Sequence, residues 1–432
     1  MRFKQALTVT GALSTAALLL SACAQGEAEG SDDDAGNGEA EDVTISFTWW
    51  GGDARYQNTQ EMVDLFEEEY PHISVDIQYA DWQGYWDQLA TQAAAGDAPD
   101  VIQMDTRYLR EYIENGVLLE LDAVETSEYA EELLENGLHE GSLYALPVTS
   151  NSFALVTNEE LFTEAGLELP DDETWTWEDF TEITAEISAN TDGYGLGRPP
   201  GDAGLELWLR QHAGVNLVDG EGELSWQPED AESYFDLLQQ MSDSGALPSA
   251  EEVSEDRAAG NEQTFIGTGQ AALSPGFDAN AVGISAAGDL ELTALRWPSP
   301  TGSSADAELF YRASMFFSVY SGSEHPEEAQ LLVDFLGNNE EAGQIQLIER
   351  GIPGNETIRD LIRDDLDDIE RDVLEYNESI ADVATEPPPL PPEGYGAVED
   401  IVFRYEEEFL FGRVSAAEAA EGVHREITEA IN

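Results

Sequence analysis

The sequence predicts an α/β protein with two lobes. Between residues 43 and 104, segments with the alternating pattern of strands take turns with segments that carry apolar residues at helical spacing, which favours a parallel sheet covered by helices. The chain has 432 residues, which is long for one compact core and makes two lobes the better expectation. Hydrophobic residues make up 41% of the chain and include nine tryptophans, so it is a folded protein and not an acidic disordered tail.

Residues 1–22 have the pattern of a secretory signal. Arg2 and Lys4 precede an apolar stretch at residues 6–20, which is too short and too rich in Thr, Ser and Gly to span a membrane comfortably. The stretch ends in LSAC, which resembles the lipobox of bacterial lipoproteins. Cys23 is the only cysteine, so it has no disulfide partner, and we expect lipidation at Cys23.

Residues 23–42 predict an acidic, flexible tether. After the cysteine they read AQGEAEGSDDDAGNGEAED, which contains no aromatic or large aliphatic residue and cannot bury enough surface to order itself. Together with a lipid, such a tether would hold the folded part away from the outer face of the cell membrane. No later segment has the length of a spanning helix, so we expect everything after residue 42 to be soluble.

Five elements are predicted in order after the tether. They are a strand at 43–50, a helix at 58–70 that Pro71 ends, a strand at 73–79, a helix at 82–95 and a short buried strand at 100–104. Ligands of parallel sheets bind beyond the carboxyl ends of the strands. The loops at 51–56, 80–85 and 105–108 are therefore expected to form one rim of a binding site.

The rest of the chain continues with a strand and a series of helices. A strand is predicted at 151–157, a helix begins at 159–165, and Thr176 with Asp179 predicts a capped helix start. Further helices are predicted at 228–245, 326–338, 358–376 and 415–431. Residues 386–396 read EPPPLPPEGYG and can be neither helix nor central strand, so an ordered loop is expected there.

The chain is strongly acidic, with 91 Asp and Glu against 17 Lys and Arg and a formal net charge of -74. Nucleic-acid binding requires clustered basic residues, so that class of partner is excluded. Lys4 is the only lysine. Two explanations of this bias stay open: a salty environment, where screening weakens repulsion between carboxylates, and a codon bias against lysine.

Motifs of common enzyme classes are absent. The chain has no phosphate-binding loop, no His-Glu-x-x-His, no Gly-x-Ser-x-Gly and no cysteine nucleophile. The glycines at 193–197 have the wrong spacing for a dinucleotide site, and the five histidines lack the spacing of metal ligands. We therefore expect no catalytic residues, no metal and no cofactor, although a pair of catalytic carboxylates is impossible to recognise among so many acids.

The predicted rim instead carries aromatic residues next to single charged or amide groups. The sequences WWGGDARY at 49–56 and DWQGYW at 81–86 place flat apolar faces beside planar hydrogen-bonding groups. Sugars stack their C–H faces on aromatic rings and pair their hydroxyls with such groups, so this mixture suits a neutral carbohydrate. Core packing explains any one of these tryptophans equally well, and Trp49 and Trp50 must face opposite sides of their strand.

Over most of its length after the tether, the chain resembles the extracellular solute-binding proteins of bacterial ABC importers, in the branch that binds sugars and oligosaccharides. The resemblance rests on FTWWGGDARY, YADWQGYWDQLATQAAAGDAPDVIQMD, YALPVTSNSFALVTNEELF, SMFFSVYSGSEHPEEAQLLVDFL and RGIPGN, in this order behind a lipobox. It implies a two-lobed periplasmic-binding-protein-like fold with a hinge of crossing strands and the ligand cleft between the lobes. Lobe I would comprise residues 43–150 plus 313–352, and lobe II residues 151–312 plus 353–432.

The resemblance also implies a set of ligand-binding residues. They follow the first three strands, enter the cleft from the central segment, or lie in later turns near the cleft: Trp50, Asp53, Arg55, Asp81, Trp82, Asp105, Arg107, Asn151, Phe277, Asp278, Arg350 and Tyr395.

The function expected from these observations is a monomeric, lipid-anchored receptor. It would capture a sugar or oligosaccharide and deliver it to the permease subunits of an ABC importer, without catalysis of its own. Two alternatives stay open, a surface-anchored carbohydrate-active hydrolase and a receptor for peptides or polyamines. Arg55 and Arg107 count against a polyamine, because a polycation needs anionic pocket groups.

Overall fold

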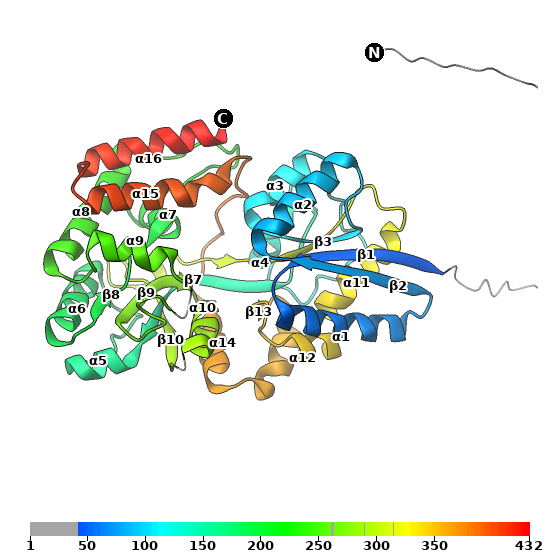
Figure 1. Ribbon diagram of the computed structural model, residues 1–432, viewed down its shortest axis with the longest axis horizontal. Coiled ribbons are helices and arrows are strands. Elements are labelled where there is room, and N and C mark those ends of the chain that lie inside the picture. The colour runs from blue at the N-terminus through cyan, green and yellow to red at the C-terminus, as the bar shows by residue number, and fades with distance from the viewer. Residues whose placement is uncertain (1–41, 261–262, 289, 314) are drawn as a thin grey trace, which may run out of the picture. The chain divides into compact units, whose positions relative to one another are not determined.

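The computed structural model describes residues 42–432, except 261–262, 289 and 314 (Figure 1). The predicted signal, Cys23 and all but the last residue of the predicted tether lie outside the described residues. Within the described part, every helix falls short of the length and hydropathy that a membrane span requires.

The first sheet has five strands in the order β2-β1-β3-β12-β6. They are β1 (Val43–Trp50), β2 (Ile73–Ala80), β3 (Val101–Met104), β6 (Leu146–Pro147) and β12 (Phe316–Val319). β1 runs parallel to β2 and β3, as the alternation of strands and helices predicts. β12, which lies outside the alternating region, is antiparallel to both β3 and β6, so the complete sheet is mixed. This strand returns from a distant part of the chain, where local alternation carries no information about strand direction.

Helices follow the first three strands almost without loops. They are α1 (Asp53–Glu69), α2 (Trp82–Ala95) and α3 (Thr106–Glu114). The side chain of Asp81 caps α2 by accepting the Gly84 N–H at 3.0 Å, and Asp105 caps α3 by accepting the Arg107 N–H at 2.9 Å. The rim segments predicted as loops are therefore mostly first helical turns, and α1 begins five residues before the predicted position 58.

Further elements accompany the first sheet, namely a separate two-stranded sheet of β4 (Leu138–His139) and β5 (Ser142–Leu143), the short helix α4 (Glu131–Leu134) and helices from later in the chain. These later helices are α11 (Pro326–Asn338), α12 (Glu340–Gln346) and α13 (Glu356–Ile362). α11 has the predicted bounds. α13 packs on α12, and its first N–H donates to the Glu128 carbonyl at 2.8 Å.

The second sheet is built around one long strand, β7. Its strands are β7 (Thr149–Asn158), β8 (Tyr194–Leu196), β9 (Ala271–Phe277) and β10 (Leu292–Leu295), and the short strands β11 (Tyr311–Arg312) and β13 (Ile352–Pro353) also pair with β7. All ten residues of β7 are buried. β7 is antiparallel to β9 and β10, while β8 is parallel to β9, so this sheet also mixes directions.

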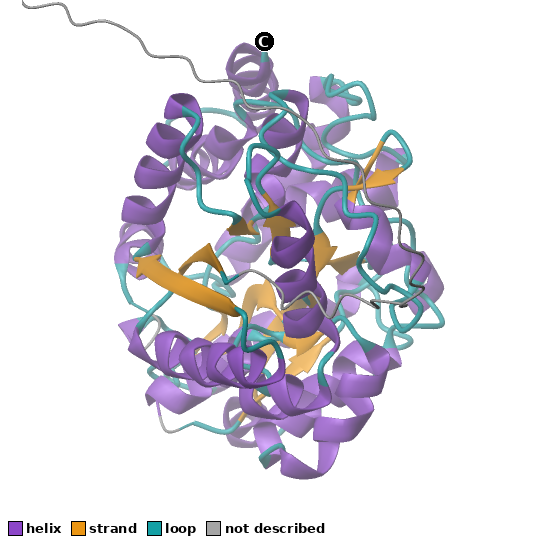
Figure 2. Ribbon diagram, turned by 90° about the vertical axis from the view of Figure 1, so that its right-hand side faces the viewer, coloured by secondary structure: helices purple, strands orange, loops and turns teal. Residues whose placement is uncertain are grey.

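Nine helices surround the second sheet among the described residues. They are α5 (Glu159–Ala165), α6 (Trp177–Asn190), α7 (Gly201–Ala213), α8 (Pro228–Ser244), α9 (Ala250–Ala258), α10 (Asn280–Gly288), α14 (Asp368–Ser379), α15 (Val398–Leu410) and α16 (Ala416–Ile431). α6 begins with the predicted capping box of Thr176 and Asp179. Figure 2, in which the side that carries β1 and β2 faces the viewer, shows that helices surround the strands of the molecule.

One predicted helix is wrong. The segment 358–376 contains the end of α13, a 3-10 turn at Arg363–Asp365 and most of α14. The Asp367 side chain accepts the Glu370 N–H, and the Glu370 side chain accepts the Asp367 N–H, so a new helix starts where the apolar periodicity continues. A local cap thus interrupts a pattern that looks continuous.

Among the described residues, three connections pass between the two sheet-centred parts: β6 to β7, β11 to β12, and the segment from α12 to β13, which pairs with β7. β6 and β7 are separated by one residue but belong to different sheets, and β11, which pairs with β7, leads into β12 of the first sheet. The proline-rich segment 386–396 contains no α-helix or strand, as predicted, but its last two residues begin a 3-10 turn at Tyr395–Ala397. Arg210 donates to the Glu386 carbonyl at 2.9 Å and Arg110 to the Leu390 carbonyl at 3.4 Å, which holds this loop in place.

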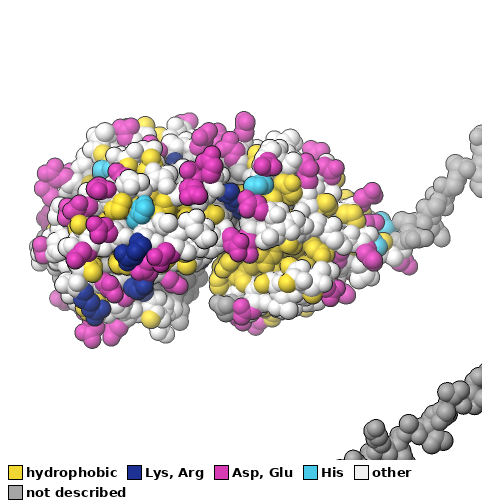
Figure 3. Space-filling model, turned by 90° about the horizontal axis from the view of Figure 1, so that it is seen from above, with side chains coloured by type: hydrophobic (Ala, Val, Ile, Leu, Met, Phe, Trp, Pro, Cys, Tyr) yellow, Lys and Arg dark blue, Asp and Glu magenta, His cyan; other side chains and the backbone are white. Residues whose placement is uncertain are grey.

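Acidic side chains are spread over the visible face of the molecule (Figure 3). The same view shows a hollow between the two sheet-centred parts. Most acidic side chains are therefore solvated surface groups. Only the few acidic side chains that face cavities are candidates for ligand binding.

Candidate functional site

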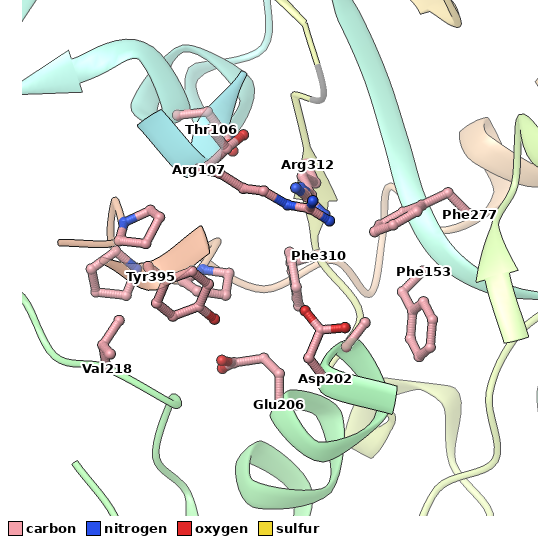
Figure 4. A pocket seen from close by; sticks show the side chains of 15 residues that line it. Thr106, Arg107, Phe153, Asp202, Glu206, Val218, Phe277, Phe310, Arg312 and Tyr395 are labelled. Atoms are coloured by element: carbon pink, nitrogen blue, oxygen red, sulfur yellow. The ribbon is translucent and has the colours of Figure 1, made fainter. Parts of the chain in front are cut away.

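A cavity of about 90 Å³ is lined by residues from elements of both sheets (Figure 4). Its wall comes from the start of α3, from α7, from β7, β9 and β11, and from the proline-rich loop. The lining residues are Thr106, Arg107, Asn136, Phe153, Asp202, Ala203, Glu206, Val218, Phe277, Phe310, Arg312, Pro388, Pro389, Pro391 and Tyr395.

Aromatic rings form part of the wall. Phe153 and Phe277 are paired residues on the antiparallel strands β7 and β9, so their side chains share one face of the sheet. Their ring centroids lie 5.8 Å apart in an edge arrangement, and Phe153 also stacks on Trp297 at 5.0 Å. Phe310 and Tyr395 add further rings. The cavity therefore offers flat apolar faces held by packing behind them.

Two arginines reach the cavity. Arg107 comes from the capped first turn of α3 and forms an ion pair with Glu399 of α15 at 2.8 Å, which joins the two sheet-centred parts. The Arg312 guanidinium lies over the Phe277 ring, 5.0 Å from its centroid. In Figure 4 both guanidinium groups lie in the same part of the cavity.

Two acids of α7 lie on another side of the cavity. Asp202 and Glu206 are four residues apart and share one helix face. Glu206 is 5% exposed, and its Oε2 accepts the Leu217 N–H at 2.9 Å. Burial raises the pKa of Glu206 to about 7, outweighing the Leu217 hydrogen bond and the attraction of Arg210. Its buried Oε1 accepts no hydrogen bond from a described residue.

Two larger cavities share Phe277 with the first. One of about 710 Å³ also contains Phe153, Asp202 and Glu399 in its wall. The other, of about 530 Å³, is lined among others by Asn151 and Arg350. Phe277 thus stands at the junction of three hollows along β7, which is the setting of an extended binding cleft.

The predicted tryptophans lie in a different place. Trp50 is 8% exposed and packs edge-on against Trp82 at 5.0 Å, and it also contacts Tyr85 and Trp86. Trp82 is 36% exposed. Neither ring lines one of the three cavities around Phe277.

Four charged residues predicted at the rim are engaged in local contacts. Asp53 accepts the Tyr79 hydroxyl at 3.0 Å, and Asp81 and Asp105 cap their helices as described above. Arg55 pairs with Glu349 at 3.0 Å. These side chains hold the rim together in the structure.

Three predicted residues lie close to β7. Asp278 is fully buried and accepts hydrogen bonds from Asn377 Nδ2 at 2.8 Å and the Ser152 N–H at 3.2 Å. Burial raises the pKa of Asp278 to about 7. Arg350 donates to Gln103 Oε1 at 3.2 Å and Thr59 Oγ1 at 2.7 Å, and burial lowers its pKa to about 9. Asn151 lies on β7, in register with Arg312.

The structure therefore brings only some of the predicted residues together. Arg107, Phe277 and Tyr395 line the first cavity, while Asn151, Phe277 and Arg350 line the one of about 530 Å³. The remaining predicted residues line none of the three cavities around Phe277.

Most lining residues of the first cavity were missed by the sequence reasoning, and those with aromatic or charged side chains are Phe153, Asp202, Glu206, Phe310 and Arg312. Phe153 lies two positions after Asn151 on one strand and so on the same face, which was a usable signal. No local signal marks Arg312, because its place depends on strand pairing across more than 150 residues. Among the described side chains, no group of three or more His, Cys, Asp and Glu is arranged to hold a metal ion.

Comparison with known proteins gives consistent matches. Residues 61–372 match the model of the bacterial extracellular solute-binding protein family. A putative binding protein of Brucella abortus is 27% identical over 143 residues, which is 32% of this chain and 34% of that protein. A lactose-binding protein of Rhizobium radiobacter is 25% identical over 228 residues, half of this chain (50%) and 49% of that protein. These matches span only a third to a half of the curated relatives.

Solved structures extend the similarity to the whole fold. An extracellular solute-binding protein, family 1, from Alicyclobacillus acidocaldarius is 24% identical with a TM-score of 0.74. The alignment covers 91% of this chain and 99% of that one. At this identity the likeness concerns the fold, and the α/β architecture with two sheets agrees with it.

Proposed function

The chain belongs to the bacterial extracellular solute-binding proteins, and from this membership we propose that it captures a sugar or oligosaccharide outside the cell. The proposed receptor delivers this ligand to the permease of an ABC importer and has no catalysis of its own. The lactose-binding relative supports a sugar as ligand.

The main support for this proposal is the combination of side chains that line the first cavity. Phe153, Phe277 and Tyr395 present rings, while Arg107 and Glu206 present planar hydrogen-bonding groups. Pyranose rings need both, because their C–H faces stack on aromatic rings and their hydroxyls donate to carboxylates and accept from guanidinium groups.

Closure of two lobes around the ligand is part of the proposal. The lobes are residues 43–150 plus 313–352 and residues 151–312 plus 353–432, connected by the crossing strands at β6–β7 and β11–β12. A ligand that contacts residues of both lobes favours the closed state by its extra affinity for that state. In this scheme the remaining predicted residues of the first three strand ends, among them Trp82 and Asp53, contact the parts of a longer ligand that extend beyond Phe277.

We place the receptor on the outer face of the cell membrane, as a monomer held by lipid on Cys23 and the tether up to residue 42. The lipobox-like sequence and the apolar segment before it support this placement. Replacement of Cys23 by Ala in cells should release the protein from the membrane fraction into the medium. Membrane retention of that variant would contradict the anchor without affecting the assignment of the ligand site.

The function is tested by adding mono- and oligosaccharides to the purified protein. A receptor shows saturable binding and a melting temperature that rises with ligand concentration relative to Kd, without release of reducing ends. The carbohydrate-active hydrolase, the alternative, releases reducing ends from an oligosaccharide. Turnover of any bound sugar would therefore reject the receptor.

A further inference from the structure

Arg312 stands apart from the other cavity residues because its charge has no partner among the residues that the structure describes. The guanidinium is half-buried in the cavity and lies over the Phe277 ring. It forms no ion pair and no hydrogen bond with a described residue. Five N–H donors in a planar fork are thus left facing the cavity.

This situation is unusual within the molecule. Every other arginine that the structure describes, except Arg413, pairs with or donates to an oxygen of the protein. Arg413 also lies over a ring, 4.3 Å from the centroid of Phe411, but it is exposed on the surface, where water satisfies it. Arg312 has the same stacking with less access to water.

A half-buried guanidinium without a partner lowers stability, because its lost hydration is not replaced. The chain contains 91 acidic residues, so a carboxylate at this position would be easy to supply. The fold instead leaves Arg312 unpaired beside Arg107, and a guanidinium fork fits a carboxylate with two parallel hydrogen bonds. A ligand carboxylate would supply the missing partner.

The acids of the cavity are suited to hydroxyl groups. Glu206 already accepts one backbone N–H, and its other oxygen is buried and free to accept a second hydrogen bond. Asp202 lies one turn away on the same helix. A sugar hydroxyl can donate a hydrogen bond to such an oxygen without adding a second charge to the buried part of the cavity.

We propose that the ligand is an acidic saccharide, such as a hexuronate or a short chain of hexuronates, and that Arg312 binds its carboxylate. This inference rests on the proposed function and names the substrate class of the same site. It replaces the neutral carbohydrate expected from the sequence, because only the folded structure shows that Arg312 lines the site. The sugar ring packs on Phe277, with its hydroxyls toward Glu206.

The test uses pairs of sugars that differ only in the group at carbon 6. D-galacturonate is compared with D-galactose, and α-1,4-linked digalacturonate with the corresponding neutral disaccharide, by calorimetric titration of the purified protein. We expect the acidic member of a pair to bind at least about tenfold more tightly, because a charge-assisted, two-pronged hydrogen bond is added. Raising the salt concentration should weaken only the acidic member.

Substitutions of single arginines then test which residue causes the preference for the acidic sugar. Arg312→Gln should remove the preference for the acidic sugar, and Arg312→Lys, which keeps the charge but loses the fork, should leave part of it. Arg413→Gln is the matched control, since that arginine also stacks on a ring and is unpaired, and it should leave binding unchanged. The melting temperatures of the unliganded variants show whether each one folds.

The possible outcomes separate this inference from the proposed function. Equal or tighter binding of the neutral sugars overturns the acidic ligand and leaves the sugar receptor standing. An acidic preference that persists in Arg312→Gln overturns the role of Arg312. If no sugar of either kind binds at millimolar concentration, or free amino acids bind in their place, both proposals fail.

Discussion

Two regions of this molecule are rich in aromatic residues, and they differ in what their polar neighbours do. Around Trp50, the rings of Trp82, Tyr85 and Trp86 pack on one another. Around Phe277, rings lie beside two charged side chains, and the guanidinium of Arg312 and one carboxylate oxygen of Glu206 have no partner within the described part of the chain. Aromatic content alone therefore does not identify a ligand site, whereas charged side chains without a described partner beside the rings indicate a candidate one.

The largest expected effect is on stability, because the rings of the two regions should contribute different amounts to the free energy of unfolding. Trp50→Ala should lower the free energy of unfolding by about 3–5 kcal/mol, because it leaves a cavity among packed rings. Denaturant unfolding followed by circular dichroism measures the loss. Phe277→Ala, at a half-buried ring, should cost clearly less, and equal losses would contradict the contrast drawn between the two regions.

The next effect concerns pH and the buried acid of the cavity. The pKa of Glu206 is about 7 in the folded protein and 4.5 ordinarily, so the folded state holds this proton more tightly. Its contribution to stability is complete below pH 4.5 and is lost as the pH rises to 7, by about 3 kcal/mol.

Glu206→Gln should remove that part of the pH dependence. The measurement is the difference in unfolding free energy between variant and original protein at several pH values, in which the titration of Asp278 cancels. A difference that stays constant from pH 4.5 to 7 would show that Glu206 is already ionised across this range.

A smaller effect is expected on affinity. Phe277→Ala should weaken sugar binding by about 1–2 kcal/mol, because the ring provides a stacking face at the junction of three cavities. Trp82→Ala is the control from the other aromatic cluster, and it should weaken short sugars less. A larger loss for Trp82→Ala in calorimetric titration would move the site to the rim predicted from the sequence.

The smallest effect concerns the contact between the two sheet-centred parts. Arg107 and Glu399 form an ion pair with side chains 30% and 36% exposed, and such pairs contribute about 1 kcal/mol or less. Glu399→Gln should therefore change unfolding little, while it frees Arg107 for the ligand. A strong loss of stability, measured as a shift of the melting temperature, would show that this ion pair is needed to stabilise the fold.

Stability and affinity should also respond differently to salt. Added salt should raise the melting temperature, because it screens the repulsion among 91 acidic residues, most of them on the surface. A neutral sugar should bind equally well at low and high salt. A melting temperature that does not change with salt would favour codon bias as the cause of the acidic composition.

The sequence by itself determined the elements whose signals are local. Alternation defined β1, helical spacing defined α2, and a capping box defined the start of α6, because these patterns act within a few residues. The same logic failed where a second cap at Asp367 divided a continuous apolar pattern.

Only the tertiary structure decided which side chains meet in the cavity. Arg312 reaches it because β11 pairs with β7, and Phe277 stands opposite Phe153 because β9 pairs with β7. Register shifts of one residue would turn each of these side chains to the other face of its strand. Strand pairing joins residues more than a hundred positions apart, and no local pattern in the chain specifies it. The family resemblance indicated Arg107, Phe277 and Tyr395, whereas Arg312 became recognisable as a cavity residue only in the fold.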